Sequence, residues 1–62
     1  MKVEITHYKK DGINTVYENG KPAKLKTIIE LPLKFGYDSY NQPMRILGSN
    51  INVEDIIEIT NI

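Results

Sequence analysis

Alternation of apolar and polar residues marks two segments of the chain. In residues 2–8, Val3, Ile5 and His7 occupy every second position, with polar residues or Tyr8 between them. Successive side chains of a strand point to opposite faces of a sheet, so this period of two predicts a half-buried strand. The same alternation runs through residues 23–35 and predicts the longest strand, which Pro32 bends or ends.

Glycine-containing turn signals separate these segments. Asp11-Gly12 and Asn19-Gly20 are typical of tight turns, because glycine adopts a positive φ without steric cost. Residues 13–18 between them are rich in β-branched and aromatic side chains and predict a second strand. Residues 36–43 have the composition of a loop, residues 44–48 predict a short strand, and residues 48–50 predict a turn.

The last segment has two interpretations. Asn52 can cap a helix that runs to the end of the sequence, or it can cap a single turn over residues 53–56 that leads into a strand over residues 57–62. The β-branched Ile56, Ile57 and Ile59 disfavour a helix, so we expect the single turn and the strand.

This order of elements resembles that of SH3-like small barrels, which have five strands and a short 3-10 turn before the last one. The resemblance concerns the fold alone, since the peptide-recognition motif of SH3 domains is absent. We therefore expect one mainly β domain over residues 1–62, either a small five-stranded SH3-like barrel or a strongly twisted meander sheet. Alternatives are a sheet completed by dimerisation and an α+β domain with a C-terminal helix. The expected core consists of Val3, Ile5, Val16, Leu25, Ile29, Leu31, Ile46, Val53, Ile56, Ile57 and Ile59.

Composition narrows the function. The 62 residues contain no cysteine and one histidine, which leaves no disulfide and no thiolate or histidine-rich zinc site. We expect no metal, no cofactor and no enzymatic activity. No apolar run is long enough for a membrane span or a signal peptide, so we expect a cytoplasmic protein, and the composition suggests a bacterial or phage origin.

The loop over residues 35–45 is the strongest candidate site. It gathers three of the five aromatic residues among polar side chains, and loops on a rigid sheet are where binding residues concentrate. We expect Phe35 to be buried and the tyrosines to be exposed. The sequence thus predicts a non-catalytic binding module that contacts a protein partner through Tyr37, Asp38, Tyr40, Asn41 and Arg45.

Two other functions stay open. Lysines interleaved with tyrosines are typical of single-stranded nucleic-acid binding, although equal numbers of basic and acidic residues leave no overall positive charge. An exposed edge strand would instead allow a self-associating homodimer. We expect His7 to be structural, and the acids Glu54, Asp55 and Glu58 to face water. The candidate nucleic-acid contacts are Tyr8, Lys9, Lys10, Tyr17, Lys24 and Lys26.

Overall fold

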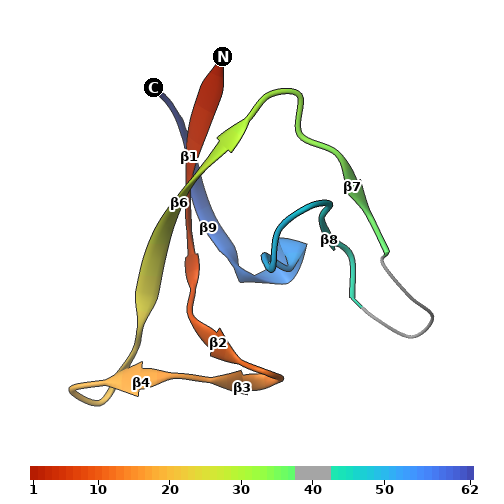
Figure 1. Cartoon of the computed structure of the whole chain (residues 1–62). Coiled ribbons are helices and arrows are strands. Elements are labelled where there is room, and N and C mark those ends of the chain that lie inside the picture. The colour runs from red at the N-terminus through yellow and green to blue at the C-terminus, as the bar shows by residue number, and fades with distance from the viewer. Residues whose placement is uncertain (38–42) are drawn as a thin grey trace.

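The computed structural model describes residues 1–37 and 43–62, and its centre is a three-stranded antiparallel sheet in the order β6-β1-β9 (Figure 1). Strand β1 (Lys2–Tyr8) lies in the middle, between β6 (Lys24–Glu30) and β9 (Ile56–Asn61). The strand predicted over residues 2–8 is therefore confirmed, and the structure shows that it is the central one. The long strand predicted over residues 23–35 ends at Glu30, two residues before Pro32.

Within the described residues, three two-stranded ladders carry the rest of the pairing between strands. The turn between β4 and β5 has φ values of 53° at Asn19 and 78° at Gly20, the signature of a type I′ hairpin turn. That turn and the one at Gly12 confirm the turn predictions, although Val16 divides the predicted second strand in two. The pairs are β2 (Lys10–Asp11) with β3 (Asn14–Thr15), β4 (Tyr17–Glu18) with β5 (Lys21–Pro22), and β7 (Phe35–Gly36) with β8 (Arg45–Ile46).

The end of the chain is a single 3-10 turn, η1 (Val53–Asp55), followed directly by β9. This confirms the second interpretation of the tail, although the Asn52 side chain makes no capping hydrogen bond. Strand β9 is not regular, because Glu58 pairs with Thr6 and Ile56 pairs with His7. Ile57 is therefore an extra residue, a β-bulge, opposite β1. No helix in the described part of the chain is long and apolar enough to cross a membrane.

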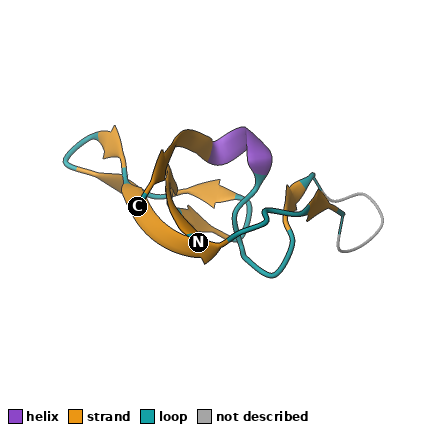
Figure 2. Cartoon of the chain, turned by 90° about the horizontal axis from the view of Figure 1, so that it is seen from above, coloured by secondary structure: helices purple, strands orange, loops and turns teal. Residues whose placement is uncertain are grey.

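The mainly β prediction is confirmed, but the predicted barrel is not. Among residues 1–37 and 43–62 the strands form one sheet and three separate ladders, which do not close on themselves. The molecule measures 35 × 32 × 13 Å. Its radius of gyration of 12.0 Å exceeds the about 10.6 Å typical of a chain of this length. In Figure 2 the β7–β8 ladder lies to one side of the three-stranded sheet, and its end next to the grey trace projects away from the sheet.

The core is small because only a short segment covers the sheet. Ile46 in β8 and Ile51 beyond the next turn pack on Val3 and Ile5 of β1. Each of the four is at most 3% exposed. Side chains around them are partly buried, namely Ile29, Leu31, Leu33 and Ile56.

The predicted core was therefore right at its centre and wrong at its edges. Leu25, Val53, Ile57 and Ile59 are exposed, and Val16 is only partly buried. Alternation identifies the face of a strand but not how far the covering layer extends, and here that layer ends near Val3 and Ile5. Ala23 and Ile51 are buried although neither was predicted to be in the core.

Candidate functional site

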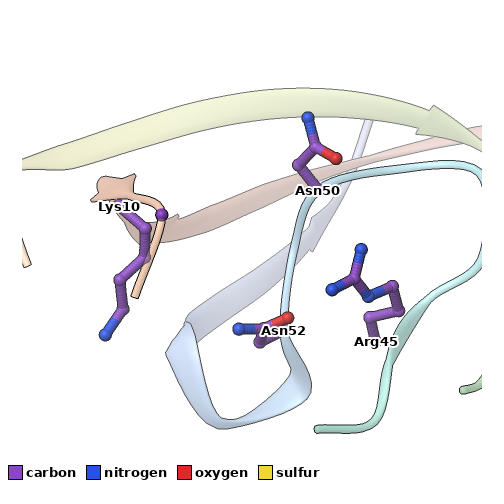
Figure 3. Close-up of a pocket in the computed structure, with 5 residues that line it drawn as sticks. Lys10, Arg45, Asn50 and Asn52 are labelled. Atoms are coloured by element: carbon purple, nitrogen blue, oxygen red, sulfur yellow. The ribbon is translucent and has the colours of Figure 1, made fainter. Parts of the chain in front are cut away.

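A polar pocket of about 250 Å³ lies where the β2–β3 turn meets the segment from β8 to η1. Lys10 and Gly12 line one side, and Arg45, Asn50 and Asn52 line the other. In Figure 3 the guanidinium of Arg45 and the amide of Asn52 point toward the space that separates them from Lys10. The pocket thus brings together side chains that are up to 42 positions apart in the sequence.

Backbone pairing holds Arg45 and Asn52 side by side. The Ile46 N–H donates to the Ile51 carbonyl at 3.0 Å, and the Val53 N–H donates to the Met44 carbonyl at 2.9 Å. Between these bonds Arg45 and Asn52 form an antiparallel bridge. Residues 47–50 make the turn that connects the two segments and that carries Asn50 to the pocket.

Ser49 fixes this turn. Its hydroxyl donates to the Ile46 carbonyl at 2.8 Å and accepts from the Ile51 N–H at 3.2 Å. Both partners of Ser49 belong to the buried core, so the turn is anchored to that core. The pocket therefore has a preformed wall rather than one that a ligand must order.

An ion pair between Lys10 and Asp55 closes the other side. The Lys10 Nζ lies 3.4 Å from Asp55 Oδ1 and donates a hydrogen bond to Thr15 Oγ1 at 3.2 Å. The Asp55 side chain is only 9% exposed, so the prediction that this acid faces water was wrong. Asp55 is buried because η1 turns it inward against the β2–β3 ladder. Glu54 and Glu58 are exposed, as predicted.

The pocket is built to receive a group that accepts hydrogen bonds. Every side chain among the described residues that line it carries N–H donors, and Lys10 and Arg45 are cationic. None of the described residues that line it is a carboxylate, and the nearby Asp55 balances part of the charge of Lys10. Arg guanidinium matches the planar, two-oxygen geometry of a carboxylate. A carboxylate or another small oxyanion therefore fits the pocket in charge and in hydrogen bonding.

Large apolar side chains are exposed around the strands that carry Arg45. We call Phe35, Tyr37, Met44 and Leu47 the β7–β8 apolar surface; their exposed fractions run from 40% to 63%. Tyr37 is exposed as predicted, whereas Phe35, at 47%, is not the buried residue that we expected. Phe35 lies opposite the buried Ile46, but nothing covers its outer side in the described part of the chain. The predicted contacts Asp38, Tyr40 and Asn41 lie outside the described residues.

The lysine and tyrosine residues of the nucleic-acid alternative do not form one surface. Tyr8, Lys24 and Lys26 share the outer face of the sheet, since Tyr8 opposes Lys24 and Thr6 opposes Lys26. Lys9 and Tyr17 lie outside the three-stranded sheet, and Lys10 belongs to the pocket. The outer face also carries glutamates, one of which, Glu4, lies 3.8 Å from Lys26. The charged residues on this face are Lys2, Lys24, Lys26, Glu4, Glu30 and Glu58.

His7 is held inside the structure, away from the pocket. It is 7% exposed, and its Nδ1–H donates to the Tyr8 carbonyl at 3.3 Å. Nε2 is hydrogen-bonded to the Thr27 hydroxyl at 2.8 Å. The sequence predicted a partly buried structural histidine, and His7 is buried more fully than that. No group of three or more His, Asp or Glu side chains that could hold a metal ion occurs in residues 1–37 and 43–62.

Comparison with known proteins assigns no family or function to this chain. No protein-family model, no curated protein and no solved structure matches the chain. The pocket and the surface beside it are therefore the features from which a function can be inferred.

Proposed function

We propose that the protein is a non-catalytic binding module that holds a protein partner on the β7–β8 apolar surface and receives one carboxylate of that partner in the polar pocket. The observation that carries the proposal is the position of Arg45. It lines the pocket and also lies opposite Gly36, in the ladder that carries the exposed Phe35. Leu47 shares the ladder face of Arg45, whereas Phe35 points to the opposite face, so a partner segment reaches both features by passing around this two-residue ladder.

The composition of the two features supports a protein partner. Aromatic residues, Met and Arg are enriched at protein interfaces, and a few such residues carry most of the binding energy. The described residues of the pocket offer donors but no carboxylate or imidazole that could act as a general base. The one histidine is occupied by Thr27 and the Tyr8 carbonyl inside the structure. These facts favour recognition over catalysis.

A selection of peptides displayed on phage, with the full chain immobilised, tests this proposal. We expect the selected peptides to share a carboxylate close to an apolar residue. Asn50→Asp places a negative charge at an exposed position of the pocket without changing side-chain size. It should therefore weaken binding of those peptides while the melting temperature stays the same.

The apolar surface has a matched control on the other side of the molecule. Tyr37 and Tyr17 are 63% and 64% exposed, but Tyr17 lies in the β4–β5 ladder. If Tyr37 is a central contact, Tyr37→Ala should lower peptide affinity roughly 30-fold, and Tyr17→Ala should leave it unchanged. Equal effects of the two variants, or selected peptides without carboxylates, would contradict the proposal.

Single-stranded nucleic acid is the second candidate partner. The observation in its favour is that Tyr8 pairs with Lys24 on the outer face of the three-stranded sheet. Fluorescence anisotropy with a labelled oligonucleotide tests it over a series of salt concentrations. Binding through phosphates should weaken linearly in a plot of log affinity against log salt, because counterions are released. The alternating charges of that face predict no such binding, and this is why we favour the protein partner.

A further inference from the structure

We propose that two copies of this chain associate through the outer edge of β6 and form one continuous six-stranded antiparallel sheet. Within the described residues β6 pairs with β1 alone, so its second edge is open. An open edge presents a row of unpaired N–H and C=O groups that can pair with another strand. This surface is separate from the pocket and from the β7–β8 apolar surface of the proposed function.

The hydrogen bonds at the two ends of β6 show which residues of this edge are available. The Lys9 N–H donates to the Ala23 carbonyl at 2.9 Å, and the Leu31 N–H donates to the Met1 carbonyl at 2.8 Å. Odd-numbered residues from 23 to 31 therefore direct their backbone groups toward β1. In an antiparallel strand these directions alternate, so the backbone groups of the even-numbered residues point outward. The outward residues are Lys24, Lys26, Ile28 and Glu30.

One two-fold register uses all four outward residues. With Thr27 opposite its own copy, Lys24 pairs with Glu30 of the second copy, and Lys26 pairs with Ile28. The two Lys24–Glu30 pairs place opposite charges directly across the ladder, where they stabilise pairing. Shifting the centre by one residue to Lys26 sets two lysines against each other. Shifting it to Ile28 sets Lys24 against Pro32, which has no N–H to donate.

The register centred on Thr27 also covers the exposed apolar side chains of β6. Leu25 and Ile28 are 44% and 57% exposed in the single chain. In the register centred on Thr27, Leu25 faces Ile29 of the second copy in a pair without backbone bonds, where side chains approach most closely. Ile28 faces Lys26 of the second copy, and the aliphatic part of a lysine side chain covers apolar surface well.

The other edge of the sheet is less suited to pairing. Strand β9 contains the bulge at Ile57, and bulges are one means by which proteins protect an edge. Glu58 is the one charged residue in β9, so two copies of that strand offer no pair of opposite charges. Glu30 on β6 has a neighbour in its own chain, the Met1 amino group at 3.8 Å. Both groups are well exposed, so that contact is worth little and leaves Glu30 available.

Charge exchange between two variants of the full chain tests the register. Glu30→Lys puts Lys24 opposite a lysine, and Lys24→Glu puts Glu30 opposite a glutamate, so each variant alone should dimerise less. Because two pairs change from attraction to repulsion, we expect the association constant to fall roughly 30-fold in each. A mixture of the two variants restores both opposite-charge pairs and should form a heterodimer in sedimentation velocity.

The matched control uses two residues that carry the same charges away from β6. Glu18→Lys and Lys21→Glu change the net charge equally, but both lie in the exposed β4–β5 ladder. Each should dimerise like the wild type, and their mixture should show no added association. The proposal is overturned if the wild type remains a monomer up to millimolar concentration, if the β6 variants dimerise like the wild type, or if their mixture fails to associate.

Discussion

The buried Lys10–Asp55 ion pair leads to an asymmetric prediction for the free energy of unfolding. At a separation of 3.4 Å, two unit charges attract each other by about 5 kcal/mol when the effective dielectric constant is about 20. Most of this attraction offsets the cost of taking both groups out of water. The net value of the pair is therefore small, and the two single substitutions should differ according to which charge remains inside.

Lys10→Met leaves the Asp55 carboxylate buried without its cation. Breaking a buried pair in this way costs about 3–5 kcal/mol. The Lys10 side chain is 27% exposed, so water can reach the remaining carboxylate and the cost should be near the lower limit, about 3 kcal/mol. Asp55→Asn leaves the cation, which is the more exposed partner, and should cost about 1 kcal/mol. A 62-residue domain has a total stability of only about 3–9 kcal/mol, so Lys10→Met should be close to unfolding.

Urea denaturation followed by circular dichroism measures both values. Lys10 also donates to Thr15, so Thr15→Val serves as the control that removes this hydrogen bond and keeps the ion pair. The double variant Lys10→Met with Asp55→Asn should be more stable than Lys10→Met alone, since it leaves no unpaired carboxylate. If the Lys10→Met variant were as stable as the Asp55→Asn variant, the claim that the buried Asp55 carboxylate needs Lys10 to balance its charge would be refuted.

Three further predictions concern packing and turns. Ile5 is fully buried, so Ile5→Ala should lower the free energy of unfolding by about 2–5 kcal/mol, whereas Ile13→Ala, at a 94% exposed position, should leave it unchanged in the same urea titration. Gly20 has a φ of 78°, so Gly20→Ala should cost about 1 kcal/mol, seen as a lower melting temperature. At Gly36 an added Cβ would lie 3.3 Å from a Leu47 methyl group. Leu47 is 41% exposed and can shift, so Gly36→Ala should cost less than about 1 kcal/mol, and nuclear magnetic resonance should show the Leu47 methyl signals moving.

The elements that the sequence predicted correctly depend on short-range patterns. The alternation in residues 2–8 and the Asn19-Gly20 turn need only neighbouring residues, and both occur in the structure. The β-branched content of the tail likewise separated a strand from a helix. Such preferences act within a few residues, so they can be read without knowledge of the fold.

The features that the sequence did not predict depend on contacts between distant segments. Asp55 looks like a surface acid until η1 brings it against Lys10, 45 positions away. Asn50 and Asn52 carry no signal of a site, because only the pairing of residues 44–46 with 51–53 places them beside Arg45. A lysine and an arginine from two candidate sites that the sequence kept apart turned out to share one pocket.

The bulge at Ile57 determines how strand β9 tolerates the loss of a residue. Deleting one residue from a strand usually shifts the register and turns every later side chain to the other face. Here Ile56 already opposes His7 and Glu58 already opposes Thr6, so the ladder has no need of the residue between them. A chain that lacked Ile57 would keep every later pair in place. The beginning of β9 can thus lose a residue without disturbing the sheet, a tolerance that is normally found only in loops.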